Sequence, residues 1–341
     1  MNTVLVFPHF CPLNQSFFLE GLRTVFGARH ILYSTRGFPV FKRSGHLKCI
    51  VHGSRESRLF IDHWDSPVFD DEGLAWSDVY AKRNIDPDRI PTPQSRKIIA
   101  TGPSFPLRID DSAASLYDAL KTWILSAQVA PSGRFDYAKT KEHFAGWYRQ
   151  TRYGLEHDAY TPGTSKSDYV FFSSSIWKYE ADTNRVRAHF IEACRSLGDV
   201  QFEGGFTPRS ANDVRGFEHL TVGRRYSHDE FLGKTKVSAV VFNNPAVERA
   251  FSWRLGEALA LGKAIISTPL ERLVPAPLVH GEHIHFVDPT FESIQAAVRQ
   301  LCENEGYRRK LEQGARQYYL DHVSPAAAIR RAVLTAEQAV M

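Results

Sequence analysis

An arginine and a glutamate lie one helical turn apart near the start of a predicted helix in the second half of the sequence. The helix spans 253–261, with Ser252 in the N-cap position and Gly262 as its stop. Arg254 falls in the first turn, where free backbone amides and the helix dipole favour an anion. Glu257 follows one turn later on the same side, where its carboxylate can accept hydrogen bonds from ribose hydroxyls. These residues predict a phosphate and ribose site, although a solvated arginine and a glutamate that favours the helix start fit the same spacing.

Three serines follow the first strand predicted in this half, at 168–173. Ser173, Ser174 and Ser175 open toward a helix, so their hydroxyls and amides can cradle a phosphate. Satisfying the backbone of their own loop is an equally good use for the same hydroxyls. The pair Gly204-Gly205 ends the next predicted strand and lets the backbone approach a ligand closely, which predicts a supporting position behind the direct contacts.

The first half of the sequence carries three candidates for a base. His9 follows a short apolar strand at 3–7, and an imidazole with a pKa near neutrality can take the proton of a hydroxyl. A histidine in a proline-rich loop is more often structural. Asp62 and Asp65 flank His63-Trp64 behind another predicted strand, so a carboxylate there is the rival base, beside an aromatic ring that can stack on a sugar. The sequence leaves the choice between His9 and the two aspartates open.

Strands and helices alternate along the second half, which places these side chains at strand ends. The predicted strands there are 168–173, 200–203, 236–243, 264–267 and 283–287. The predicted helices are 184–197, 228–232, 253–261, 291–301, 307–319 and 325–340. The first half alternates less regularly, with strands at 3–7, 30–33, 47–51, 58–62 and 97–100 and a helix at 15–26. This order predicts an α/β fold with parallel, doubly wound sheets, whose ligands bind outside the carboxyl ends of the strands.

The length of 341 residues predicts about two domains, and a cluster of turn formers at 161–165 marks the expected boundary. The expected organisation is a first domain at 1–164 with a helical bridge at about 112–160, a second domain at 165–324, and a helix at 325–341 that packs back toward the first domain. In the bridge, apolar residues recur at helical spacing: Leu116, Leu120, Trp123 and Ile124.

Composition excludes several classes of function. The excess of basic over acidic side chains gives a net charge of only +4, which is too small to predict nucleic-acid binding. The pI of 8.8 still suits anionic ligands locally. The four cysteines form neither a CxxC pair nor a compact framework, which predicts reduced thiols in a cytoplasmic protein. No segment approaches the ~18 apolar residues that span a bilayer, and the first residues do not resemble a signal peptide. The charge and the aromatic residues of the bridge permit peripheral association with the inner face of a membrane.

The segment from Phe251 to Ser267, a helix that leads through a glycine into a hydrophobic strand, resembles the donor-site segment of GT-B glycosyltransferases. Residues 281–288 and the helices after them are similar to the tail of the same domain, so that the resemblance covers about 168–325. It implies two Rossmann-like domains that face a cleft, the first for the acceptor and the second for a nucleotide-sugar donor. The implied reaction moves a sugar from that donor to a hydroxyl of a glycan or glycolipid, as in polysaccharide biosynthesis.

Segments at 171–177 and 187–197 resemble bacterial glycosyltransferases that are related to the exostosin and fucosyltransferase families. That resemblance assigns the diphosphate to Arg187, or less readily to Arg185. The segment 78–82 resembles an Asp-x-Tyr-x-Lys element of the same enzymes, to which the sequence assigns no role.

The residues and the resemblance together imply one set of donor-site side chains. Its members are Ser173, Ser174, Ser175, Arg187, Ser252, Trp253, Arg254 and Glu257. The cysteines and the fourteen histidines show no zinc-ligand spacing. We therefore expect transfer without a metal or another cofactor, with positive groups and helix amides neutralising the diphosphate. Two alternatives share this architecture: a nucleotide-sugar epimerase or hydrolase, and a degenerate GT-B protein that only binds a nucleotide or glycan.

Overall fold

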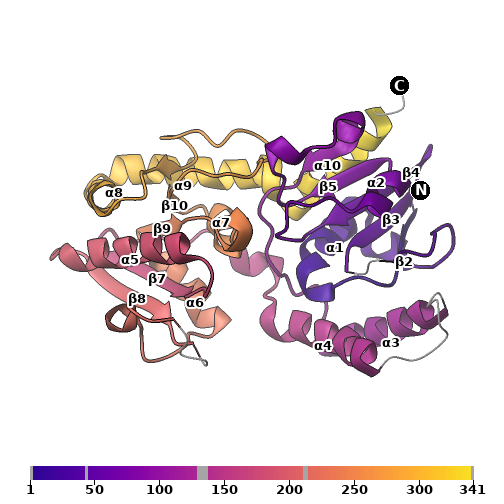
Figure 1. Ribbon diagram of the computed structural model, residues 1–341, viewed down its shortest axis with the longest axis horizontal. Coiled ribbons are helices and arrows are strands. Elements are labelled where there is room, and N and C mark those ends of the chain that lie inside the picture. Colours follow the sequence, from indigo (N-terminus) through magenta and orange to yellow (C-terminus); the bar gives the residue numbers. More distant parts are fainter. Residues whose placement is uncertain (1–2, 43–44, 129–136, 210–213, 339–341) are drawn as a thin grey trace. The chain divides into compact units, whose positions relative to one another are not determined.

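The chain forms two compact units in the computed structural model, which describes residues 3–42, 45–128, 137–209 and 214–338. The first unit comprises Met1–Ala159 and His322–Met341, and the second comprises Tyr160–Asp321. Each unit contains a largely parallel sheet flanked by helices (Figure 1). The expected fold class, α/β with two Rossmann-like units and C-terminal helices, is confirmed. The chain leaves the first unit at Ala159, a few residues before the boundary expected from the sequence.

The first unit is built on a six-stranded sheet in the order β2-β1-β3-β4-β5-β6. Its strands are β1 (Thr3–Val6), β2 (Ile31–Tyr33), β3 (Leu47–His52), β4 (Glu56–Asp62), β5 (Val79–Lys82) and β6 (Ile98–Ala100). Strand β3 runs antiparallel to both β1 and β4. The connection from β3 to β4 is too short for the crossover that a parallel pair would need. The start of β3 therefore lies at the same edge as the ends of β4 and β5. Side chains from three separate segments meet there.

Helices α1 (Pro12–Phe26) and α10 (Pro325–Gln338) pack together in the first unit, which also contains the short helix α2 (Asp71–Trp76). Gly21 permits the close approach of α1 to α10, because a Cβ atom there would lie 2.2 Å from the carbonyl oxygen of Pro325. Pro325 suits the first position of α10, where its missing N–H costs no hydrogen bond. The last helix thus completes the first unit.

Helices α3 (Ser112–Gln128) and α4 (Tyr137–Tyr153) form a pair that belongs to the first unit. Helix α3 buries small side chains, namely Ser115, Ala119 and Thr122. Four of its large apolar side chains are between 45% and 64% exposed, namely Leu116, Tyr117, Leu120 and Ile124, whereas Trp123 and Leu125 are half-buried. The helical spacing expected in the bridge is present, but most of the stripe that it marks faces outward. Residues 129–136 of the bridge and 339–341 of the expected last helix lie outside the described residues.

The second unit has five parallel strands. Strand β7 (Tyr169–Ser175) pairs with β8 (Gln201–Thr207), while β10 (Ala264–Ser267) pairs with β9 (Val240–Asn243) and with β11 (His285–Phe286). The amide of Ala239 donates to the carbonyl of Tyr169 at 2.7 Å and joins β7 to β9. The two-stranded sheet β8-β7 and the three-stranded sheet β9-β10-β11 thus adjoin at β7 and β9. Because the connections reverse direction between β7 and β9, a ligand crevice is expected at the carboxyl ends of these two strands.

Five helices described in the second unit flank these strands. They are α5 (Ala181–Ser196), α6 (His228–Val237), α7 (Trp253–Ala260), α8 (Phe291–Glu303) and α9 (Glu305–Tyr318). A capping box of Ser227 and Glu230 starts α6. The strand expected at 236–243 begins only at Val240, because α6 continues to Val237. The rings of Phe172, Phe190 and Phe242 pack with centroids 4.5–6.1 Å apart and fix α5 against β7 and β9.

Within the described ranges, no helix combines the length and the apolar character needed to cross a bilayer.

Candidate functional site

Two guanidinium groups are fixed at the carboxyl end of β7. Arg187 of α5 is only 3% exposed; its Nε donates to Asn244 Oδ1 at 2.9 Å and its Nη1 to the carbonyl oxygen of Ser175 at 3.0 Å. Arg254 of α7 donates from Nη2 to the carbonyl oxygen of Ser173, and its guanidinium lies 4.6 Å from the ring centroid of Phe172. The structure therefore brings the two arginines selected from the sequence to one edge of the sheet.

The two guanidinium groups are close enough for the charge of Arg254 to act on Arg187. Among the described residues, neither forms an ion pair with a carboxylate. Burial, and then the charge of Arg254, lower the pKa of Arg187 to about 9. Burial also lowers the pKa of Arg254 to about 10, against the opposing effect of Glu257. Both groups stay charged at neutral pH, so their mutual repulsion is present until an anion relieves it.

The amino end of α7 is the second component of the site. Ser252 caps the helix by accepting from the amide of Leu255 at 3.3 Å, and its hydroxyl donates to Asn243 Oδ1 at 2.9 Å. The cap thus links α7 to the end of β9. Trp253 lies in the first turn and is 42% exposed. Free amides of this turn and the helix dipole add to the positive potential of the arginines.

The loop before α7 holds an unusual backbone. Glu248 and Arg249 both have positive φ values, 53° and 60°, in the left-handed region that side chains other than glycine rarely adopt. The amide of Glu248 donates to Glu180 Oε1 at 3.1 Å, which helps to keep the loop in this form. A small pocket borders the loop, and its lining residues are Asn243, Asn244, Pro245, Arg249, Ala250, Phe251, Ser252, Leu270 and Glu271. Strained backbone of this kind is a common property of ligand-binding loops.

Glu257 lies one turn further along α7 and is 6% exposed. Its Oε1 lies 3.2 Å from Nε2 of His228, the first residue of α6. Tyr160 also contacts this pair, with its hydroxyl 3.3 Å from the same nitrogen. Sequence reasoning found Glu257 but neither partner, because residues 29 and 68 positions apart meet only through the fold.

The serines at the end of β7 act here through their backbone. The carbonyl oxygens of Ser173 and Ser175 accept from the two arginines, and that of Ser174 accepts from Thr207 Oγ1 at 3.2 Å. Ser173 and Ser174 are buried, whereas Ser175 is exposed. A cradle of serine hydroxyls around a phosphate stays a prediction.

Gly204 permits the close pairing of β8 with β7: its φ is 116°, and a Cβ atom would lie 1.9 Å from the carbonyl oxygen of Phe172.

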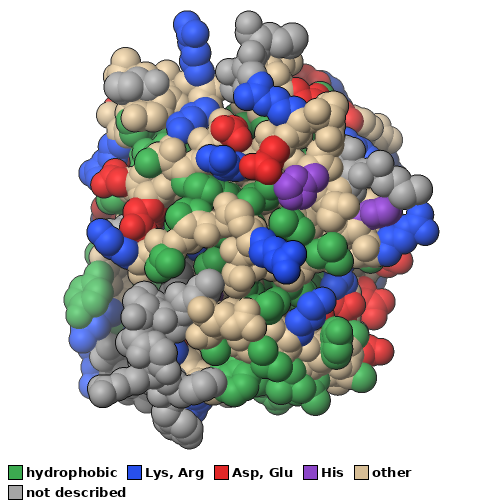
Figure 2. Space-filling view, turned by 90° about the vertical axis from the view of Figure 1, so that its right-hand side faces the viewer, with side chains coloured by type: hydrophobic (Ala, Val, Ile, Leu, Met, Phe, Trp, Pro, Cys, Tyr) green, Lys and Arg blue, Asp and Glu red, His purple; other side chains and the backbone are tan. Residues whose placement is uncertain are grey.

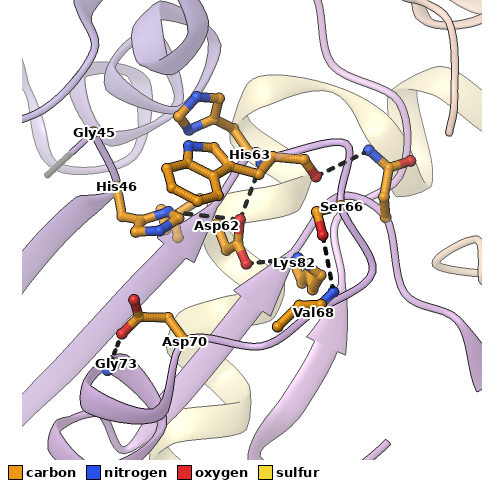
Figure 3. A network of polar contacts seen from close by, with 12 residues as sticks. Gly45, His46, Asp62, His63, Ser66, Val68, Asp70, Gly73 and Lys82 are labelled. Atoms are coloured by element: carbon orange, nitrogen blue, oxygen red, sulfur yellow. Dashed lines mark hydrogen bonds and ion pairs between the residues drawn. The ribbon is translucent and has the colours of Figure 1, made fainter. Parts of the chain in front are cut away.

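Asp62, one of the three candidate bases, is buried in the first unit, where its carboxylate accepts three hydrogen bonds. One carboxylate oxygen accepts from Lys82 Nζ at 2.6 Å and from the hydroxyl of Tyr80 at 2.8 Å. The other accepts from the amide of Trp64 at 3.0 Å and lies 3.5 Å from Nδ1 of His46 (Figure 3). These hydrogen bonds and its burial give Asp62 a structural place.

The Asp-x-Tyr-x-Lys element obtains a physical account from the same contacts. It forms β5, where side chains two positions apart share a face. Tyr80 and Lys82 both donate to Asp62, and Asp78 accepts from the amide of Arg58 at 2.8 Å. The element thus ties β5 to β4.

His9 and Asp65 are the exposed candidates. Asp65 follows the end of β4, has a side chain that is 47% exposed, and forms an ion pair with Arg83. Trp64 beside it is 40% exposed. Desolvation of the His9 ring, and then the charges of Lys48, His143 and Lys139, lower the pKa of His9 to about 4. Its imidazole is therefore neutral at physiological pH.

The site residues thus fall into two groups. The donor-site set lies in the second unit, and the three candidate bases lie in the first. Within the described part of the chain, no cluster of histidine, cysteine and acidic side chains is arranged to hold a metal ion.

No protein-family model and no curated protein matches this sequence. A sucrose-phosphate synthase from Thermosynechococcus elongatus is similar at 10% identity and a TM-score of 0.42, over 95% of this chain and 93% of that one. A glycosyltransferase from Rickettsia africae is similar at 12% identity and a TM-score of 0.45, over 83% and 70%. The C-terminal domain of a group 1 glycosyl transferase from Francisella tularensis is similar at 18% identity and a TM-score of 0.34, over 52% and 93%. The function proposed below is argued from the residues of the site itself.

Proposed function

We propose that the chain is a glycosyltransferase that moves a sugar from a nucleotide-sugar donor to a hydroxyl of a glycan or glycolipid acceptor. The observation that carries this proposal is the pair Arg187 and Arg254 at the carboxyl ends of β7 and β9: Arg187 is buried, Arg254 is half-buried, and neither forms an ion pair with a carboxylate among the described residues. A diphosphate has the charge and the oxygen atoms that this pair requires.

In the proposed reaction, the acceptor oxygen bonds to the anomeric carbon while the bond from that carbon to the diphosphate oxygen breaks. The leaving diphosphate takes up the electron pair, and Arg187, Arg254 and the amides at the start of α7 stabilise its charge. Glu257 accepts from the ribose hydroxyls. A base on the first unit, His9 or Asp65, takes the acceptor proton. Because fixed positive groups stand where the diphosphate charge develops, we propose that no metal ion or other cofactor is needed.

Titration with UDP, GDP, ADP, CMP and dTDP, followed by thermal unfolding, tests this proposal. One nucleoside diphosphate should stabilise the protein, by about 2.7 kcal/mol at ~100 times its Kd. The same shift is expected in the presence of a chelator. A sugar attached to the preferred nucleoside diphosphate should then be transferred or slowly hydrolysed. Analysis of the products without an acceptor separates transfer from epimerisation. Failure of all nucleotides to shift the unfolding transition would overturn the proposal.

We also propose that the acceptor is presented at an anionic membrane surface at the inner face of the membrane, where helix α3 would dock a cytoplasmic protein. The outward stripe of α3 is apolar, and Figure 2 shows hydrophobic side chains along the lower edge of the face where this helix lies. Helices α3 and α4 together carry more basic than acidic side chains. The five basic ones are Lys121, Lys139, Lys141, Arg149 and Arg152, and the two acidic ones are Asp118 and Glu142. Both acidic groups lie near arginines of this unit. Apolar insertion beside excess positive charge suits an anionic bilayer.

Replacement of Leu116, Leu120 and Ile124 together by serine should lower binding to anionic vesicles by at least about tenfold, because three side chains lose their insertion into lipid. Cosedimentation with vesicles of anionic and of neutral lipid measures the effect. Leu334→Ser is the matched control, since Leu334 is a 56% exposed leucine on α10 of the same unit. Equal vesicle binding by the triple variant and the control would contradict the docking surface.

A further inference from the structure

Two side chains from separate parts of the second unit lie beside the carboxylate that is proposed to bind ribose. Together with that carboxylate we call them the Glu257 cluster: Tyr160, His228 and Glu257. His228 Nε2 lies 3.2 Å from Glu257 Oε1, and the same nitrogen lies 3.3 Å from the Tyr160 hydroxyl. Tyr160 is 1% exposed and Glu257 is 6% exposed, whereas the His228 side chain is 27% exposed. The cluster therefore has one side that solvent reaches.

We propose that Tyr160 and His228 are positioning residues that hold the Glu257 carboxylate in the orientation in which it accepts hydrogen bonds from the ribose hydroxyls of the donor. This inference rests on the proposed function, which supplies the ribose.

The hydrogen-bond donors and acceptors of the cluster support this arrangement. Burial, and then the charge of Glu257, raise the pKa of Tyr160 well above its ordinary value, so the phenol keeps its proton and offers a donor beside the carboxylate. For His228 to donate to Glu257 as well, Nε2 must carry a proton. An ionised carboxylate offers about four lone pairs. Two donors from the protein leave acceptor capacity for the two hydroxyls of a ribose.

Both donors are held by rigid elements. His228 is the first residue of α6, whose entry is fixed by the capping box of Ser227 and Glu230. Tyr160 is the residue at which the second unit begins, and Arg316 Nη1 donates to its carbonyl oxygen at 3.4 Å. Another Tyr–Glu contact of this unit joins Tyr169 and Glu203 at 2.7 Å; Tyr169 is the first residue of β7, at the opposite end of that strand from Ser175. It provides a chemically matched comparison.

Tyr160→Phe removes one hydroxyl and tests the inference. The Kd of the preferred nucleoside diphosphate should rise about tenfold, the usual range for loss of a hydrogen bond to a charged group. The Kd of the analogue that lacks both ribose hydroxyls, and that of inorganic pyrophosphate, should change by less than about twofold. Tyr169→Phe should leave all three constants unchanged. A mutational effect that is confined to ligands with a ribose distinguishes positioning of Glu257 from general loss of stability.

A pair of histidine variants supplies an independent measurement. His228→Gln keeps an N–H donor near the position of Nε2, whereas His228→Ala removes it. The glutamine variant should retain most of the preference for ligands with ribose hydroxyls, and the alanine variant should lose it. An equal loss of affinity for all ligands, or no loss, would overturn the inference while leaving the proposed function standing. If the wild-type protein binds no nucleoside diphosphate, the proposed function fails first and the inference fails with it.

Discussion

Arg254→Met should weaken nucleoside diphosphate binding by about ten- to a hundredfold, because charge-assisted hydrogen bonds to phosphate contribute about 1.5–3 kcal/mol. The free energy of unfolding without ligand should stay within about 1 kcal/mol of wild type or rise. Methionine keeps apolar contact with the ring of Phe172, on which the guanidinium now lies. The substitution also removes the charge that lowers the pKa of Arg187. Binding and stability are therefore expected to change independently.

Isothermal titration with the preferred nucleotide, together with urea unfolding of the unliganded protein, measures both quantities. Arg185→Met is the matched control: Arg185 is on α5 two positions before Arg187, but it is 61% exposed and pairs with Asp182 at 2.8 Å. It should leave affinity unchanged. Unaltered affinity in Arg254→Met, with a loss of several kcal/mol in stability, would show that Arg254 serves packing alone.

The position of Arg254 could be predicted because parallel strands bring their carboxyl ends to one edge of a sheet. A capped helix start at Ser252 and an alternation of buried strands with helices were sufficient signals for that edge. Arg187 was selected only through the resemblance of 187–197 to bacterial glycosyltransferases. His228 and Tyr160 gave no such signal, because their meeting with Glu257 depends on how α6 and the first residue of the second unit pack.

Three features of the first unit show where reasoning from sequence pattern stops. Strand β5 was not predicted, because charged residues border and end a run of four residues whose side chains are nevertheless all buried. The apolar period of α3 was predicted correctly, yet a period alone does not say which face is covered. Asp62 was chosen for its place at a strand end; only the structure shows its carboxylate paired with Lys82 from β5.

Lys82→Met should lower the free energy of unfolding by about 3–5 kcal/mol, the usual consequence of removing one partner of a buried ion pair. Lys82 is 0% exposed and Asp62 has a side chain that is 2% exposed, with 2.6 Å between Nζ and Oδ2. The variant leaves a buried carboxylate with the hydroxyl of Tyr80 and the amide of Trp64 as its donors. Burial without a counter-ion is the cause of the loss, and chemical denaturation measures it.

Combining Lys82→Met with Asp62→Asn removes the unpaired charge and should restore part of the lost stability, so that the two effects are strongly non-additive. The same variants separate the candidate bases. If Asp62 were the base, Asp62→Asn alone would abolish transfer while the protein stayed folded at wild-type stability. The paired, enclosed carboxylate predicts the reverse: a loss of stability, with residual turnover in the folded fraction.

The exposed side chain of Asp65 forms the matched comparison. Asp65→Asn should leave stability nearly unchanged, and its turnover then decides whether Asp65 or His9 receives the acceptor proton.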